Sequence, residues 1–82
     1  MQGGVAKLTP VDRHVARRIK GKRLALGLSE DEVATVLGIE RDRMEEYERA
    51  RVRVPAEQLL RLSEFLGVPI SYFFPSVPCP GG

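Results

Sequence analysis

The stretch from Ser29 to Arg49, SEDEVATVLGIERDRMEEYER, constrains the fold more than any other part of the chain. Ser29 followed three residues later by Glu32 is the pattern of a capping box, in which each side chain bonds the other residue's backbone N–H at a helix start. Gly38 comes just after an apolar run, where a left-handed residue ends a helix without strain. A second helix is predicted from about Arg41. The stretch therefore predicts two short helices joined by a tight turn.

The second of these helices has one apolar and one charged side. At about 100° per residue, Met44, Tyr47 and Glu48 fall on one arc, which we expect to face the core. The opposite arc, away from the expected core, carries Asp42, Glu45, Glu46 and Arg49, with Arg41 at its edge. Glu48 is therefore predicted to be a carboxylate on a buried face.

A second charged residue stands in an apolar stripe near the start of the chain. Thr9 and Pro10 predict a helix start, and the stripe that follows is Val11, Val15, Ile19, Arg23 and Leu26. An unpaired buried charge costs several kcal/mol. We therefore predict that Arg23 pairs with Glu48 and ties the first helix to the third. The alternative is that both side chains extend separately to solvent.

The rest of the chain predicts two further helices. Pro55 opens the fourth helix, whose core side is Leu59, Leu62 and Leu66, and a last short helix is expected from Ile70 to Phe74. The expected fold is all-α, a compact bundle of five helices. Residues 10–74 would form this domain, with a flexible N-terminus at 1–9 and a flexible Pro/Gly tail at 75–82 that holds Cys79, an incidental thiol.

Composition excludes several function classes. The chain has one His, one Cys and no metal-ligand spacing, phosphate-binding loop or nucleophile–base set, so we expect no enzyme and no cofactor. No apolar run approaches the roughly 20 residues of a membrane span, and the lone cysteine fits a reducing cytoplasm.

Charge is segregated along the sequence. Residues 1–28 have a net charge of +6, while residues 29–49 hold eight acids against three bases, a net charge of −5. Such asymmetry favours binding of a polyanion on one face. The alternative is that the basic first helix and the acidic middle neutralise each other.

Five positions have the spacing of a DNA-binding helix-turn-helix: Ala34, Gly38, Ile39, Met44 and Tyr47. Four segments in order strengthen this interpretation: KRLALGLS, VLGI, YER and LLRLSEFLGV. Over about residues 11–74 the sequence resembles the Cro/CI-type (XRE) helix-turn-helix family of phage repressors and bacterial regulators. The resemblance implies a five-helix, lambda-repressor-like fold and a transcriptional regulator of repressor or controller type. It also implies that a dimer inserts the third helix of each copy into the major groove of double-stranded DNA.

Three residues depart from the family pattern. Glu30 replaces the common Gln, whose amide helps to hold a phosphate, and an ionised carboxylate cannot donate. Glu40 replaces Ser or Thr at the start of the recognition helix. Ala50 replaces the usual Gly after YER, at a small backbone cost if the left-handed angle remains. The first two changes add negative charge where DNA is expected.

The family geometry assigns candidate DNA-contacting residues. Candidates for base contact are Arg41, Asp42, Glu45 and Glu46, because Arg can bind guanine edges and a carboxylate can accept from cytosine N4. Candidates for backbone contact are Arg43, Arg49, Arg51 and Arg53. Acids near phosphates would cost roughly a few kcal/mol, which pairs of Glu45 with Arg49 and Arg43 with Glu46 would reduce. The alternative is a protein-binding module or antiactivator that uses the acidic third-helix face, with DNA binding weakened or lost.

An apolar surplus near the C-terminal end predicts a homodimer. Its candidate contacts are Val52, Val54, Ile70, Tyr72, Phe73 and Phe74. The alternative is that Phe73 and Phe74 only complete the core of the monomer. As a regulator, the protein would be cytoplasmic, of bacterial or phage origin and associated with the nucleoid.

Overall fold

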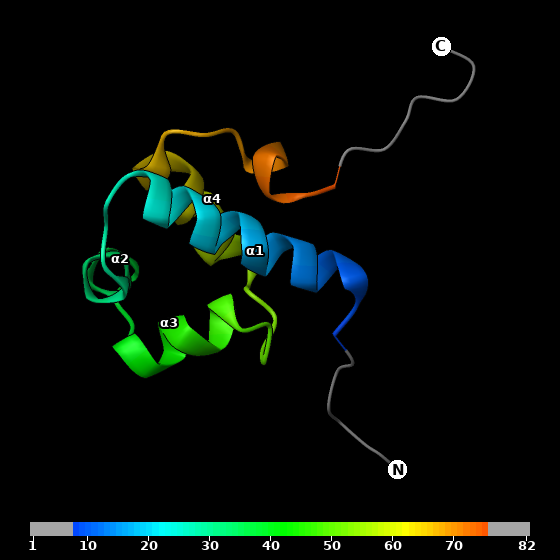
Figure 1. Ribbon diagram of the computed structural model, residues 1–82, viewed down its shortest axis with the longest axis horizontal. Helices are drawn as coiled ribbons and strands as arrows, with labels where there is room; N and C mark the ends of the chain where they lie inside the picture. The colour runs from blue at the N-terminus through cyan, green and yellow to red at the C-terminus, as the bar shows by residue number, and fades with distance from the viewer. Residues whose placement is uncertain (1–7, 76–82) are drawn as a thin grey trace.

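The computed structural model describes residues 8–75 and shows an all-helical bundle (Figure 1). The helices are α1 (Pro10–Ala25), α2 (Glu30–Leu37), α3 (Arg41–Glu48) and α4 (Ala56–Leu66), followed by the 3₁₀ turn η1 (Ile70–Phe73). No strand occurs within residues 8–75. The predictions for residues 1–7 and for the tail from 76 to 82, including Cys79, lie outside the described residues. Within residues 8–75, none of the helices has the length and apolar composition that a membrane span requires.

Capping boxes begin α1 and α2. The Ser29 hydroxyl accepts from the Glu32 backbone N–H at 3.0 Å, and the Glu32 carboxylate accepts from the Ser29 N–H at 2.8 Å. Thr9 and Asp12 form the same arrangement at the start of α1. Each box pairs two backbone donors that a helix start leaves without partners. The predicted cap at Ser29 is therefore confirmed.

Left-handed residues end the helices that carry the turn. Gly38 has a φ of 71° after α2, and the Ile39 N–H closes the turn by donating to Ala34 O at 3.0 Å. After α3, Ala50 has a φ of 56° and is the one residue other than glycine with positive φ in the described part. A Cβ in this region is disfavoured. The departure from Gly at this position therefore keeps the backbone shape with a strained residue.

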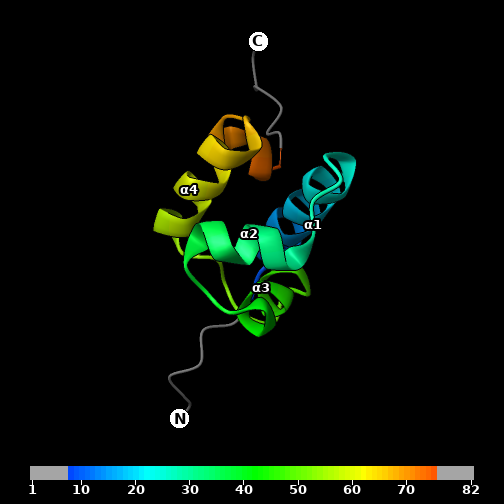
Figure 2. The ribbon, with the colours of Figure 1, turned by 90° about the vertical axis from the view of Figure 1, so that its left-hand side faces the viewer.

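The core lies where the helices converge. In Figure 2, α2 lies between α1 and α4, with α3 below it. The most deeply buried side chains come from all these elements and from η1: Ile19, Val33, Met44, Leu62 and Phe73. Tyr47 and Glu48 are buried beside Met44, so the predicted inner face of α3 is confirmed. Val11 and Leu26, which we expected in the core stripe of α1, are exposed instead.

The short helix predicted from Ile70 to Phe74 is a 3₁₀ helix that ends at Phe73, and the other helices within the described residues are four α-helices. This segment is a single 3₁₀ turn, in which the Tyr72 N–H donates to Pro69 O at 2.9 Å. The few residues between Pro69 and Pro75 favour a short i→i+3 turn over a longer helix. Arg18 of α1 holds the turn, because its Nε donates to Tyr72 O at 3.1 Å and its guanidinium lies 4.4 Å from the centre of the Tyr72 ring.

Candidate nucleic-acid interface

A buried ion pair fixes α3 to α1. Arg23 Nε lies 2.7 Å from Glu48 Oε2, and Arg23 Nη2 donates to Glu48 Oε1 at 3.0 Å. The remaining Nη1 donates to Leu28 O at 2.8 Å. Arg23 is 7% exposed and Glu48 is 8% exposed. The two residues predicted to pair therefore meet in a two-bond geometry, which orients α3 relative to α1.

The protonation of this pair follows from its surroundings. The hydrogen bonds to Glu48 raise the pKa of the Arg23 guanidinium above its ordinary value, with burial opposing the rise. Burial raises the pKa of Glu48 above its ordinary value, and the bonds from Arg23 oppose that rise. The nearby carboxylate of Glu30 pushes the pKa of Glu48 in the same direction as burial. The negative charge of Glu48 therefore depends on Arg23.

The outer arc of α3 carries most of the predicted contact residues. A cavity of about 350 Å³ is lined by Asp42, Glu45, Glu46, Arg49 and Arg51. Arg43 pairs with Glu46 at 3.2 Å, as the sequence predicts. The predicted pair of Glu45 with Arg49 does not form within residues 8–75. Glu45 pairs instead with Arg41, at 4.0 Å. Within residues 8–75, Arg49 and Arg51 form no ion pair or side-chain hydrogen bond, so both are available to an anion.

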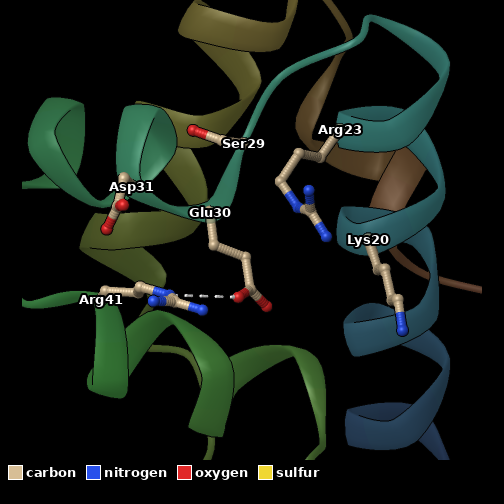
Figure 3. Close-up of a pocket in the computed structure, with 6 residues that line it drawn as sticks. All are labelled: Lys20, Arg23, Ser29, Glu30, Asp31 and Arg41. Carbon is tan, nitrogen blue, oxygen red and sulfur yellow. Dashed lines mark ion pairs between the residues drawn. The ribbon is translucent and has the colours of Figure 1, made fainter.

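Arg41 lies at the edge of this arc, next to Glu45, and also lines a second cavity. The second cavity, of about 440 Å³, is lined by residues of α1, of the α2 start and of α3: Lys20, Arg23, Ser29, Glu30, Asp31 and Arg41 (Figure 3). Arg41 Nε lies 3.8 Å from Glu30 Oε1. The sequence did not predict this pair, although Glu30 had stood out as a departure from the family pattern. The predicted base-contact set is thus divided between two cavities.

Arg53, a candidate for phosphate contact, is held by another part of the protein. Its Nε and Nη2 donate to the Asp12 carboxylate at 3.1 to 3.2 Å. The Thr9 backbone N–H and Arg53 hold the pKa of Asp12 below its ordinary value. This pair joins the connector after α3 to the start of α1. One sequence feature could have indicated this pair: Asp12 is the only acidic residue among the first 28 and so a natural partner for an arginine.

Comparison with known proteins identifies the fold family. The profile of the helix-turn-helix domain family matches residues 14–71. The chain belongs to this helix-turn-helix family, and it is of the Cro/CI type.

Relatives of this helix-turn-helix domain are named as regulators. A protein from Sinorhizobium medicae, named an uncharacterized HTH-type transcriptional regulator, is 40% identical over 76 residues, which cover 93% of this chain and 55% of the relative. The chain therefore spans about half the length of the curated relatives it matches.

Two solved structures share the fold. The restriction-modification controller protein C.AhdI from Aeromonas hydrophila has a TM-score of 0.70 at 26% identity, covering 76% of this chain and 94% of that chain. The hypothetical transcription factor NHTF from Neisseria has a TM-score of 0.74, covering 92% of this chain and 86% of that chain. Its 19% identity shows the fold alone.

The candidate dimer residues of the helix-turn-helix domain separate by burial. Phe73 is fully buried and Val54 is 8% exposed, so both belong to the core of the monomer and were wrongly proposed as dimer contacts. Val52 and Tyr72 are partly buried against that core. Ile70 and Phe74 are exposed, at 38% and 40%. Of the six candidates, only these two expose large apolar area to a partner, because the side chains of the other four are buried or partly buried within the monomer.

Proposed function

We propose that this domain is a sequence-specific double-stranded DNA-binding transcriptional regulator, of repressor or controller type, that inserts α3 into the major groove. The observation that carries the proposal is the orientation of α3, whose inner side is fixed by Arg23 and Glu48 while its outer arc is exposed or partly exposed. A recognition helix needs this arrangement, because its side chains can discriminate bases only if the backbone is held in one position. Membership in the helix-turn-helix family supports the same function.

The side chains of the outer arc suit G·C-containing sites. Arg49, which the sequence assigned to the DNA backbone, has no ion pair within the described residues and is proposed here to bind guanine O6 and N7 instead, at roughly 1–3 kcal/mol of discrimination. The Asp42, Glu45 and Glu46 carboxylates can accept from cytosine N4 and repel misplaced phosphates. Their repulsion of the DNA backbone lowers affinity for all sequences. Specific contacts therefore account for more of the binding energy than in a basic recognition helix.

The backbone contacts of this proposal fall to the arginines around α3. Arg51 is exposed and without an ion pair within residues 8–75, so it is the foremost candidate for a phosphate contact. Arg43 must exchange Glu46 for phosphate, and Arg53 must exchange Asp12. In this proposal residues 10–74 act as the DNA-binding unit, and the protein is associated with the nucleoid.

A homodimer would place two copies of α3 on DNA half-sites one helical turn apart. The exposed side chains of Ile70 and Phe74 supply apolar area for such a contact, with Val52 and Tyr72 at their margin. Phe74→Ser should shift sedimentation toward monomer, whereas Leu60→Ser, which changes an exposed leucine of α4, should not. A wild-type chain that stays monomeric at high concentration would exclude the dimer.

Selection from random duplexes tests the proposed function directly. We expect a palindromic consensus, and affinity for it should fall steeply between about 50 and 200 mM salt as phosphate contacts release counterions. Arg51→Ala should reduce the slope of log affinity against log salt by about one. The matched control is Arg61→Ala, which removes an exposed arginine of α4 and should leave the slope unchanged. Selection without enrichment of any duplex would reject the proposed function.

A further inference from the structure

Glu30 lies among three cations in the cavity between α1, α2 and α3. Figure 3 shows its side chain pointing into this space, with Arg41 of α3 on one side and Arg23 and Lys20 of α1 on the other. The carboxylate is partly buried, with the Glu30 side chain 22% exposed, whereas the Arg41 side chain is 59% exposed. Glu30 therefore stays within the protein while Arg41 reaches toward solvent.

Of these cations, Arg41 is the one that forms an ion pair with Glu30, and its exposed guanidinium also lies 4.0 Å from Glu45. The Arg23 guanidinium already donates hydrogen bonds to the Glu48 carboxylate and to Leu28 O. The carboxylate of Glu30 nevertheless acts on that buried pair, since it contributes to the raised pKa values of both Arg23 and Glu48. The 3.8 Å contact with Arg41 is long and its arginine is exposed, so the pair can open at low cost.

We propose that Glu30 is an internal competitor for Arg41, so that duplex binding requires Arg41 to exchange this carboxylate for the DNA. The inference rests on the proposed function and adds to it a residue that sets affinity without touching a base. Arg41 is the cation at the first position of α3, where a groove-bound helix meets the DNA. Glu30 lowers affinity in two ways, by pairing with this cation and by repelling phosphate.

The size of the effect can be bounded. Opening an exposed ion pair costs roughly 1.4- to fivefold in affinity, and a like charge about 8 Å from phosphate in water costs about a further twofold. Together these predict that Glu30→Gln tightens duplex binding by about three- to tenfold. Asp31→Asn is the matched control, since it removes one charge from the same helical turn, lines the same cavity and has no ion pair with Arg41 among the described residues. It should tighten binding by only about twofold.

The test combines affinity with a readout that needs no DNA. In the free protein, the ¹⁵Nε–¹Hε resonance of Arg41 should shift in Glu30→Gln and stay in place in Asp31→Asn. Duplex affinities of the wild type, both variants and the same variants in an Arg41→Ala background then give the coupling. We expect the advantage of Glu30→Gln over Asp31→Asn to vanish when Arg41 is absent. Thermal melting of each variant shows that the fold is kept.

The outcomes separate the inference from the proposed function. If Glu30→Gln and Asp31→Asn tighten binding equally, or if the advantage of Glu30→Gln over Asp31→Asn persists without Arg41, the competitor role is overturned while DNA binding stands. An unmoved Arg41 resonance in Glu30→Gln would overturn it as well. If no chain binds any duplex, the proposed function fails and the inference fails with it.

Discussion

The two faces of α3 use the same residue types in different surroundings. On the inner face, Glu48 is buried and takes two hydrogen bonds from a buried arginine at 2.7 and 3.0 Å. On the outer face, Arg43 and Glu46 meet at 3.2 Å, with their side chains about half exposed. Water competes for the outer charges and is excluded from the inner ones. The inner pair is therefore expected to fix position, and the outer pairs are expected to exchange partners.

This difference explains how the backbone of an acidic helix can be held in place while its outer side chains remain available to bind DNA. Desolvated charges must keep their partners, because the penalty for leaving one unpaired is several kcal/mol. Exposed pairs contribute roughly 0.2–1 kcal/mol, which a single contact to a base or phosphate can replace. The inner pair thus holds the backbone of α3 while the outer side chains stay free to bind. Substitutions in pairs of different burial should therefore differ in their effect.

The largest effect is expected from separating the inner pair. Glu48→Met leaves the Arg23 guanidinium buried without a counter-ion, which should cost about 3–5 kcal/mol of unfolding free energy. Arg23→Met should cost less and should become milder as pH falls, because burial raises the pKa of Glu48 and a proton can neutralise it. Urea denaturation of both variants at several pH values measures the difference.

The double variant Arg23→Met/Glu48→Met separates charge from packing. Apolar side chains of similar length often replace a buried ion pair at little net cost. We expect the double variant to be more stable than Glu48→Met alone by about 2 kcal/mol or more. If Glu48→Met by itself costs less than about 1 kcal/mol, the inner pair does not hold α3, and the comparison of the two faces fails.

An intermediate effect is expected at Asp12, which is neither buried nor free. Its carboxylate caps α1 and pairs with Arg53, and its pKa lies below the ordinary value of 3.8. An unfolded chain then binds the proton more tightly than the folded one, so the stabilisation is present above pH 3.8 and is lost as pH falls below it.

Substitution of Asp12 tests this intermediate case. Asp12→Asn should cost about 1 kcal/mol at neutral pH. The difference from the wild type should shrink as pH falls through the acid range, which thermal melting as a function of pH measures. Asp31→Asn serves as the control, because Asp31 has neither a cap bond nor an ion pair among the described residues. A constant difference at all pH values would exclude the carboxylate as its cause.

Much of the fold could be predicted from the sequence because its signals are local or periodic. The cap at Ser29 depends on two residues three positions apart, and the buried face of α3 depends on helical spacing. The pairing of Arg23 with Glu48 could be predicted from the sequence for a different reason. Each was a charged residue in an apolar stripe, and a core tolerates such charges in complementary pairs.

The remaining features, which are the burial of single residues and the partners of exposed charges, depend on the three-dimensional arrangement and cannot be predicted from the spacing of apolar residues. Phe73 and Phe74 are adjacent and chemically identical, yet Phe73 is buried as the last residue of η1, whereas Phe74 follows η1 in extended backbone and is exposed. Arg53 was assigned to DNA from its charge, but its partner Asp12 lies 41 positions earlier. The contact of Glu30 with Arg41 likewise spans the turn between two helices. Exposed cations have many possible acceptors, and only the folded arrangement selects among them.

The smallest effect is expected from the outer pair of Arg43 and Glu46. Arg43→Ala and Glu46→Ala should each change the unfolding free energy by about 0.5 kcal/mol or less. Their coupling in a double-mutant cycle should be about 0.3–0.5 kcal/mol and should decline in 0.5 M salt, because salt screens exposed charges. Duplex affinity should respond in opposite directions, falling for Arg43→Ala and rising for Glu46→Ala. A coupling above about 1.5 kcal/mol would mean that the outer charges are as fixed as the inner ones, and α3 would then have no loosely held side to offer DNA.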